Sequence, residues 1–360
     1  MLFPVSDLDE VLSRSRKAFE GLRGARIFIT GGTGFFGKWL IETLLHAERE
    51  LRLGVEAVVV SRDPARFLPE MPELLGQDAV RLVRGDVVSL SSLRGEPLMK
   101  RPFSHVLHAA TPTEARLYRE QPEAMREIIV EGTRQVLDLA ASGAAPSHRV
   151  RFLLTSSGAV YGKQPSEMTH VPEEYDGWPE PSDPASLYGI GKREAERLTL
   201  ASVARNIDPV VARCWAFSGP GLPLDGHFAI GNFIRDGRTG GPIRVGGDGT
   251  PWRSYLYAAD LAAWLWTLLV EAQPGSIYNV GSGDDLTIEQ LARKVGQFYG
   301  CEVQIAGKPV PGAPASRYVP DVRRAERDLG LRAWTSVDEA IERTEQWLRS
   351  REPAQAGARP

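Results

Sequence analysis

Residues 25–38, with the sequence ARIFITGGTGFFGK, constrain the fold more than any other stretch of the chain. A short apolar run is followed by glycines at a spacing of three, Gly31, Gly34 and Gly37, and then by apolar residues at helical spacing. The first glycine permits a tight turn out of a strand, the second lets the backbone approach a diphosphate, and the third lets a helix pack closely on a sheet. Because the N–H groups at a helix start bind phosphate, this strand–turn–helix predicts a dinucleotide cofactor site.

Strands and helices alternate along most of the chain. Apolar runs of strand length occupy residues 27–29, 55–60, 80–83, 105–110, 151–155 and 209–212. Helical segments are expected at residues 116–142 and from Pro184 to Arg205. This rhythm predicts an α/β fold with right-handed crossovers and a doubly wound parallel sheet of the Rossmann type.

The expected domain organisation has four parts. Residues 1–24 form an N-terminal helical extension, with one helix over residues 6–22 that Ser6 caps. Residues 25–217 are mainly the NAD(P)-binding domain, and residues 218–350 are mainly a smaller, interwoven α/β substrate part. Two capping boxes, Thr287 with Gln290 and Ser336 with Glu339, predict helix starts in the substrate part. Residues 351–360 are expected to be a disordered tail.

Composition excludes several functional classes. The chain of 360 residues is 42% apolar and carries a net charge of −3 without a Lys/Arg-rich run, so nucleic acid is not an expected partner. No stretch approaches the length and apolarity of a membrane span, and the N-terminus does not resemble a secretory signal. We therefore expect a cytoplasmic protein without a membrane partner. The two cysteines have no metal-like spacing, and we expect no metal site.

Tyr188 and Lys192 are four residues apart, which places both on one face of a helix. A phenol exchanges protons poorly at neutral pH unless a nearby cation stabilises its phenolate, and Lys192 could supply that charge. Ser157, at the end of the fifth predicted strand, could bind a substrate oxygen through its hydroxyl. The same residues could instead form a solvated helix surface and a strand-end cap.

The segments TGGTGFFG, GDV, HAAT, SSGAVYG, YGIGK and RCWAFSGPG, in this order, resemble the extended short-chain dehydrogenase/reductases that act on sugar nucleotides. The likeness covers about residues 25–350. It implies that Ser157, Tyr188 and Lys192 are catalytic and that Asp86 meets the adenine side of the cofactor. The expected cofactor-binding residues are Gly31, Gly34, Phe35, Phe36, Gly37, Ser61, Arg62, Asp86, Val87, Ala109, Ala110, Thr111, Tyr188 and Lys192.

The resemblance also implies contacts to a nucleotide-sugar substrate. Arg253, in the segment WRSY, matches the arginine that meets the substrate pyrophosphate, a role that suits the forked guanidinium. It could alternatively be an ordinary surface arginine. Asn232 and Arg317 resemble further contacts to the substrate nucleotide.

The sequence departs from the family pattern next to the expected catalytic serine. Related 4,6-dehydratases carry Asp-Glu at these positions, and decarboxylating relatives carry a glutamate at the second of them. Here the residues are Gly158 and Ala159, neither of which can transfer a proton. Ile129 and Ala216 replace two further family asparagines. Substrate placement is therefore expected to differ from that of the best-known epimerases.

The expected cofactor is NADP(H), with NAD(H) as the alternative. NAD-binding proteins commonly carry a carboxylate after the second strand, whereas this chain has Ser61-Arg62, which could bind a 2′-phosphate. Asp63 opposes this interpretation, although before Pro64 it is better placed to cap a helix.

These observations together predict an enzyme that transfers a hydride at C4 of a nucleotide sugar. A 4-keto reductase is favoured, because the Ser61-Arg62 pair suggests the reducing cofactor pool. A 4-epimerase is the alternative, a 4,6-dehydratase is a weaker one, and an NAD(P)-sensing binding protein is the non-enzyme alternative. A homodimer is expected, since the family commonly pairs the two long helices at residues 116–142 and 184–205.

Overall fold

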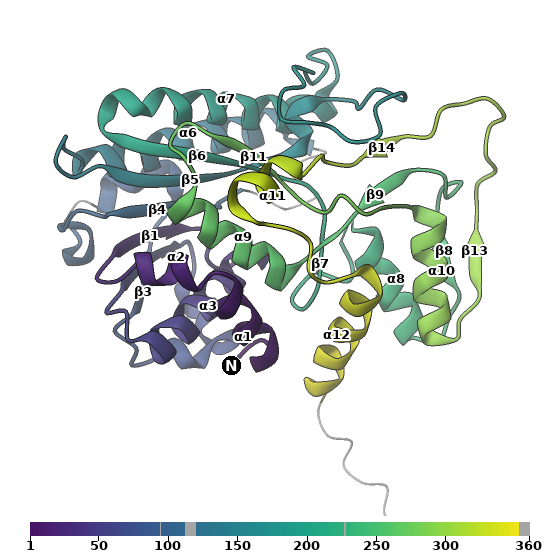
Figure 1. The fold of residues 1–360 in the computed structure, drawn as a ribbon, viewed down its shortest axis with the longest axis horizontal. Helices are drawn as coiled ribbons and strands as arrows, with labels where there is room; N and C mark the ends of the chain where they lie inside the picture. Colours follow the sequence, from purple (N-terminus) through teal and green to yellow (C-terminus); the bar gives the residue numbers. More distant parts are fainter. Residues whose placement is uncertain (94, 112–119, 227, 353–360) are drawn as a thin grey trace, which may run out of the picture.

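A parallel sheet forms the centre of the computed structural model, which describes residues 1–93, 95–111, 120–226 and 228–352 (Figure 1). Within these residues the sheet has seven strands in the order β11-β6-β5-β4-β1-β2-β3, and each neighbouring pair is parallel. The order reverses between β1 and β4, where doubly wound sheets open a crevice for ligands. The strands are β1 Arg26–Thr30, β2 Glu56–Ser61, β3 Val80–Arg84, β4 His105–His108, β5 Val150–Ser157, β6 Ile207–Cys214 and β11 Ile277–Val280.

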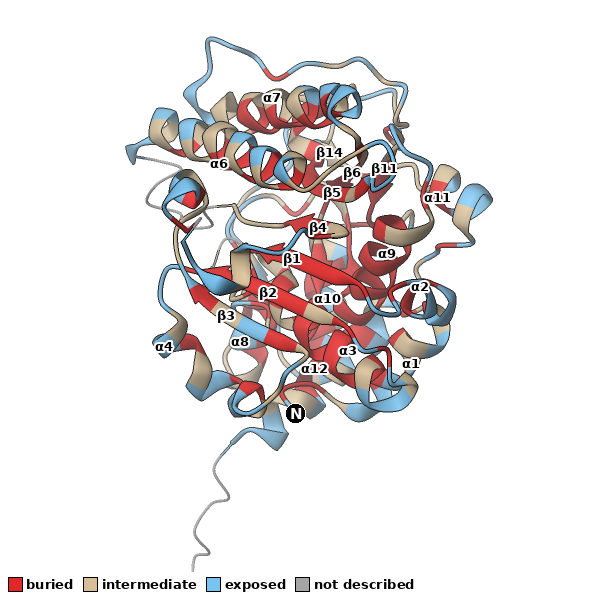
Figure 2. Cartoon of the chain, turned by 90° about the vertical axis from the view of Figure 1, so that its left-hand side faces the viewer, coloured by how far each residue is buried: buried red, intermediate tan, exposed pale blue. Residues whose placement is uncertain are grey.

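Helices cover both faces of this sheet, as expected for strands whose residues are buried on both sides (Figure 2). On one face lie α6 Pro122–Ser142 and α7 Leu187–Ala201, which pack on each other and on the strands through a cluster that includes Phe152 and Val136. On the other face lie α3 Phe35–Leu51 and α9 Ala258–Glu271. Both Trp264 and Trp266 of α9 are fully buried. The predicted Rossmann-type α/β fold is therefore confirmed.

The N-terminal extension differs from its prediction. Two helices, α1 Val5–Arg14 and α2 Arg16–Gly21, replace the single helix that we expected over residues 6–22. The chain bends at Ser15, whose hydroxyl donates to the carbonyl of Ala263 in α9. Pro4, not Ser6, occupies the position before α1, and it makes no side-chain cap. Tertiary bonds to α9 therefore break the helix.

The C-terminal part combines small sheets with amphipathic helices. The capping boxes at Thr287 and Ser336 start α10 and α12, as predicted. The helices are α8 Ala229–Arg238, α10 Ile288–Tyr299, α11 Arg323–Leu329 and α12 Val337–Ser350. The strands are β7 Phe217–Ser218, β8 Ile243–Val245, β9 Trp252–Ser254, β10 Leu256–Tyr257, β12 Asp285–Thr287, β13 Val303–Ile305 and β14 Arg317–Tyr318. They form the sheets β12-β9-β14, β13-β8 and β10-β7.

Several predicted bounds shift. The helix expected at residues 116–142 begins at Pro122 in α6, and residues 116–119 lie outside the described residues, as do residues 353–360 of the predicted tail. The seventh strand, β11, was not predicted; it comes from the C-terminal part and pairs with β6. Shorter elements are α4 Pro64–Phe67, η1 Leu68–Glu70, η2 Pro72–Leu74, η3 Val87–Leu93, η4 Pro97–Met99, η5 Gly158–Tyr161, η6 Pro184–Ser186 and η7 Ser202–Arg205. Across the described ranges, no helix is both long and apolar enough to cross a membrane.

Candidate active site

The glycine turn between β1 and α3 has room for a diphosphate. Gly31 has a φ of +73°, and a Cβ there would lie 2.5 Å from the carbonyl oxygen of Ala109. A Cβ on Gly37 would lie 2.2 Å from the Cα of Gly32, so the start of α3 packs directly on the turn. Gly34 is exposed and precedes α3 without any side-chain cap; a Cβ there would meet only the Gly31 carbonyl oxygen, at 3.4 Å. The first N–H groups of α3 therefore face open space, which fits a dinucleotide diphosphate.

A buried hydrogen-bond chain fixes the crevice between β1 and β4. The Thr30 hydroxyl accepts from the Ala110 N–H at 3.1 Å and lies 2.7 Å from Nδ1 of His108. Nε2 of His108 lies 3.2 Å from the Thr133 hydroxyl in α6. Burial, together with the nearby charge of Lys192, lowers the pKa of His108 to about 3. The imidazole is therefore neutral, and it holds the strand end that leads to Ala109, Ala110 and Thr111.

Ser61 and Arg62, at the end of β2, are the residues expected to determine whether NADP(H) or NAD(H) binds. Ser61 is buried at the strand end, and its hydroxyl accepts from the Asp63 N–H at 3.3 Å. Arg62 is exposed. The Asp63 carboxylate accepts from the Arg66 N–H at 3.3 Å and so caps α4, as the sequence predicted. The Asp63 carboxylate therefore points toward α4.

The other expected cofactor residues follow β1 and β3 in the chain. Phe35 and Phe36 form the first turn of α3, and the ring of Phe36 meets that of Phe217 edge-on at 5.0 Å. Asp86 follows β3 and accepts from the Val88 N–H at 3.2 Å. Val87 packs against the core beneath α6. These contacts leave the cofactor roles of the four residues as predictions.

Lys192 of α7 is bound at the end of β5, the strand whose last residue is Ser157, and it lies beside Tyr188. Lys192 is almost completely buried, and its Nζ donates to the Thr111 hydroxyl at 2.6 Å and to the Thr155 carbonyl at 2.7 Å. The same Nζ lies 6.0 Å from the ring centroid of Tyr188, one helical turn earlier in α7. Burial lowers the pKa of Lys192 to about 8. The ammonium group is thus held beside the phenol and is largely charged at neutral pH.

Sequence reasoning missed a buried ion pair that holds α7 against the sheet. Glu196, one turn after Lys192, binds Arg213 of β6 through Oε2 at 2.8 Å and accepts from the Ser156 hydroxyl at 2.6 Å. The Arg213 guanidinium also lies over the ring of Tyr161 at 4.6 Å. Glu196 and Arg213 are both nearly inaccessible to solvent. Loss of either residue would leave the other as an unpaired buried charge, which is strongly destabilising. Together they fix α7 against β5 and β6.

The space beside Ser157 contains two aromatic side chains that the sequence analysis did not assign. A Cβ on Gly158 would lie 2.7 Å from the ring of Trp215 and 2.8 Å from the hydroxyl of Tyr318. The two rings pack with centroids 4.4 Å apart. Gly158 therefore has no space for a side chain, and the hydroxyl of Tyr318 lies close to the end of β5. The feature of the sequence that could have pointed to Tyr318 is its position next to Arg317, an expected substrate residue.

The expected substrate residues lie on three different elements. Arg253 of β9 pairs in register with Tyr318 of β14, which places Arg317 beside Trp252. Arg317 binds Asp285 at 2.9 Å and lies over the Trp252 ring. Asn232 lies apart, on α8.

Arg253 has a different environment from Arg317. It is half-buried, donates to the Trp252 carbonyl at 2.7 Å and has no carboxylate partner within the part of the chain that the structure describes. Burial lowers the pKa of Arg253 from its usual value. A half-buried guanidinium without a carboxylate is suited to an anionic ligand.

The family model described as "NAD dependent epimerase/dehydratase family" matches residues 27–281. The chain belongs to this family. The resemblance to sugar-nucleotide enzymes found in the sequence is therefore confirmed. UDP-glucuronic acid decarboxylase 6 of Arabidopsis thaliana is 29% identical over 341 residues, which cover 94% of this chain and 92% of that protein.

Solved structures of sugar-nucleotide enzymes share the fold. The complex of MoeE5 with UDP-glucose and NAD has a TM-score of 0.71 and 26% identity and covers 90% of this chain and 99% of that one. DesIV, a dTDP-glucose 4,6-dehydratase of Streptomyces venezuelae bound to NAD, has a TM-score of 0.74 and 23% identity and covers 91% of this chain and 97% of its own. The similar proteins are named for different reactions, among them decarboxylation and dehydration, so membership of the family is compatible with more than one reaction.

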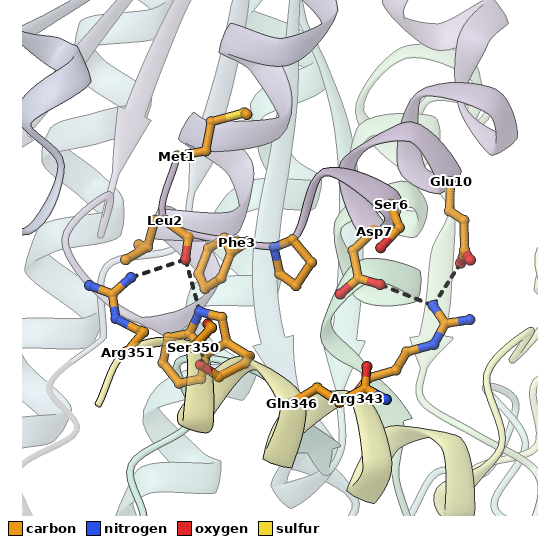
Figure 3. A pocket seen from close by; sticks show the side chains of 12 residues that line it. Met1, Leu2, Phe3, Ser6, Asp7, Glu10, Arg343, Gln346, Ser350 and Arg351 are labelled. Atoms are coloured by element: carbon orange, nitrogen blue, oxygen red, sulfur yellow. Dashed lines mark hydrogen bonds and ion pairs between the residues drawn. The ribbon is translucent and has the colours of Figure 1, made fainter. Parts of the chain in front are cut away.

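A cavity of about 600 Å³ lies elsewhere, between the N-terminal segment and α12 (Figure 3). Arg343 donates across it to Asp7 at 3.0 Å and to Glu10 at 3.1 Å. The Trp347 indole donates to the Leu2 carbonyl at 2.8 Å. These bonds across the cavity join α12 to the N-terminal extension.

Proposed function

We propose that the protein is a nucleotide-sugar 4-keto reductase. The observation that supports this most strongly is the buried Lys192 ammonium, which lies 6.0 Å from the Tyr188 ring centroid and is bound at the end of β5, the strand that ends in Ser157. A hydroxyl to bind an oxygen, a phenol to exchange a proton and a buried ammonium to stabilise the phenolate are the groups that carbonyl reduction requires.

When bound in the crevice, the nicotinamide cofactor supplies the hydride that reaches C4. Ser157 donates a hydrogen bond to the ketone oxygen and so polarises the carbonyl. Tyr188 gives its proton to that oxygen as negative charge develops there. Lys192, held by Thr111 and by the Thr155 carbonyl, stabilises the phenolate that remains. The product is a 4-hydroxyl group and the oxidised cofactor.

The positions after Ser157 lack the ionisable residues that the family resemblance implies for elimination or decarboxylation. Gly158 and Ala159 have no ionisable group, and the space at Gly158 is filled by Trp215 and Tyr318. Asp321 lies in a segment that keeps dehydratase-type features in the sequence. It is held by Arg323, whose Nε lies 2.9 Å from Oδ2, and this bond lowers the pKa of Asp321. A carboxylate so engaged is a poor proton donor. The site therefore favours a reaction that ends with hydride and proton transfer.

NADP(H) is the cofactor that we propose, although relatives such as MoeE5 and DesIV bind NAD. Asp63 caps α4, and we expect the exposed Arg62 to meet a 2′-phosphate. Arg62→Ala should weaken NADPH binding by about ten- to hundredfold, the value of a charge-assisted hydrogen bond, and leave NADH binding unchanged. Arg66→Ala, at the neighbouring exposed arginine, is the matched control. Tighter binding of NAD(H) by the wild type would refute the preference.

A 4-epimerase is the second candidate. The relatives solved with bound NAD favour it, because an epimerase oxidises and re-reduces the same carbon with a retained cofactor. The same three catalytic groups serve both reactions. Net consumption of reduced cofactor separates the two.

On the substrate side, we propose that Arg253 binds the pyrophosphate of the nucleotide, with Arg317 and Asn232 as further contacts. The absence of a carboxylate partner for Arg253 within the described residues supports its role. Arg317 is already bound to Asp285, so its contribution is expected to be smaller. Arg253→Ala should raise the KM for the nucleotide sugar with little effect on cofactor binding.

The assembly, the location and the domain division remain proposals. We propose a homodimer through α6 and α7, which pack together on one face of the sheet (Figure 1). Sedimentation showing only monomer at micromolar concentration would contradict it. The proposed cytoplasmic location and the division at residue 217 rest on the sequence.

The experiment that tests the proposed function is a panel of nucleotide sugars and their 4-keto-6-deoxy derivatives. Stoichiometric loss of NADPH, with a product heavier by two hydrogens, is the expected result. Unchanged mass without net use of cofactor would identify the epimerase instead, and loss of water or carbon dioxide would refute both.

A further inference from the structure

The hydroxyl of Tyr318 lies among the groups that carry the proposed reaction. It lies 2.8 Å from the place that a Cβ on Gly158 would take, at the end of β5, and it interacts with the Ser157 hydroxyl and with Tyr188. None of the roles proposed above uses this phenol. Three hydroxyl groups, from Ser157, Tyr188 and Tyr318, therefore converge where the substrate oxygen is expected.

Packing on both sides fixes the Tyr318 ring. The ring of Trp215 lies 4.4 Å away, and the Arg253 guanidinium lies 6.0 Å from the Tyr318 ring centroid. The backbone is held as well, because β14 pairs with β9 and the following residue, Val319, donates its N–H to the side-chain carbonyl of Gln164 at 3.0 Å. The hydroxyl is thus held in one place between the proposed substrate side and Ser157.

The phenol of Tyr318 is a hydrogen-bond donor. Burial raises its pKa well above the usual value; the Ser157 hydroxyl opposes this rise and the nearby Tyr188 adds to it. The hydroxyl therefore keeps its proton at any pH at which the enzyme works.

Ser157 can use only one proton and two lone pairs. Its Oγ already accepts from the N–H of Ala159 at 3.1 Å. If Tyr318 donates to the second lone pair, both acceptor positions of Ser157 are filled. The single hydroxyl proton must then be donated outward.

We propose that Tyr318 is a positioning residue that makes Ser157 an obligate donor to the substrate C4 oxygen. This inference rests on the proposed hydride transfer at C4. A ketone oxygen is a pure acceptor and matches such a donor. A 4-hydroxyl oxygen can accept the same bond, but it must place its own proton on another group. The arrangement therefore suits a ketone. It also explains why residue 158 is glycine, since any side chain would displace Tyr318 or Trp215.

The test is a double-mutant cycle of Tyr318→Phe and Ser157→Ala, measured with the 4-keto nucleotide sugar that gives turnover. The phenylalanine keeps the ring contact with Trp215 and removes only the hydroxyl. We expect Tyr318→Phe to lower kcat by about ten- to hundredfold, as loss of an oriented donor does, with an unchanged KM and melting temperature. In the Ser157→Ala background the same change should have no further effect. Tyr175→Phe, which removes a hydroxyl from the same aromatic cluster, should leave kcat unchanged.

Each other outcome overturns a separate claim. A normal kcat for Tyr318→Phe, or equal losses in both backgrounds, would refute the positioning role. If the wild type turns over no 4-keto sugar, the proposed function fails, and crystal structures of wild type and Tyr318→Phe then decide the positioning role alone. We expect one Ser157 rotamer in the wild type and several in the variant; the same single rotamer in both would overturn the proposal.

Discussion

The hydroxyl of Tyr318 occupies the space that a side chain at Gly158 would need, since a Cβ there would lie only 2.8 Å from it. The family resemblance implies an acid at this position in dehydratases, whereas here the space belongs to a tyrosine from β14. The neutral hydroxyl of Tyr318 is fixed by its neighbours.

Gly158→Ala should be poorly tolerated. Its methyl group would overlap the Trp215 ring and the Tyr318 hydroxyl, and overpacking of this kind costs about 1–3 kcal/mol. Activity should fall more than stability, because Tyr318 must move away from Ser157. Gly246→Ala is the control, since a Cβ on that exposed glycine meets nothing within 4 Å. Thermal unfolding and turnover of both variants check this, and a fully active Gly158→Ala would contradict it.

Two glycines of the turn should separate cofactor binding from folding. Gly34→Ala places a methyl group in open space before α3 and should weaken cofactor binding while the melting temperature changes little. Gly37→Ala places its methyl group against the Cα of Gly32 and should destabilise the fold itself. Cofactor titration and calorimetry on both proteins test the difference. Unimpaired cofactor binding by a folded Gly34→Ala would refute the diphosphate site.

The buried Glu42 should make stability depend on pH. Its Oε1 accepts from the Leu2 N–H at 3.1 Å, and burial together with the carboxyl of Glu73 raises its pKa to about 8. Folded protein therefore keeps a proton that the unfolded chain releases near pH 4.5. The stability contribution is complete below that pH and is lost as the pH rises toward 8, by at most about 1.4 kcal/mol per pH unit.

Glu42→Gln should remove this slope, since the amide carbonyl can still accept from Leu2 and carries no charge. Glu50→Gln, at an exposed position of the same helix, is the control. Unfolding free energies measured from pH 4.5 to 8 test it. An unchanged slope in Glu42→Gln would exclude Glu42 as its source.

Most of the sheet could be predicted from the sequence, because buried parallel strands form continuous apolar runs. The run before Gly31 and the one before Ser61 became β1 and β2. β11 escaped because it has only four residues, Ile277–Val280, within a segment rich in glycine. The break at Ser15 could not be predicted either, since it depends on a bond to α9 about 250 residues later in the chain.

The site was predictable only as far as local pattern reaches. The spacing of Tyr188 and Lys192 is a property of one helix, and the structure places both side chains next to each other. Tyr318 approaches Ser157 only because β14 pairs with β9 and Trp215 fills the space over Gly158. Contacts of this kind depend on tertiary packing and leave no periodic signal in the sequence.

Tyr188→Phe should abolish turnover while cofactor binding is retained. The ring still packs in α7, but the proton that the product oxygen needs is gone, and acid–base catalysis of this kind is worth about 10²–10⁴ in rate. Turnover assays and cofactor titration on one preparation check this. Activity within about tenfold of wild type would refute the role of the phenol.

The most direct measurement of the central claim uses NADPH that carries deuterium at the transferred position of C4. The substrate is a 4-keto-6-deoxy nucleotide sugar. The account predicts a product that carries one deuterium on sugar C4 and one new hydroxyl proton. The oxidised cofactor and this product should form in equal amounts. A product without deuterium, or a nucleotide sugar that has lost water or carbon dioxide, would contradict reduction at C4.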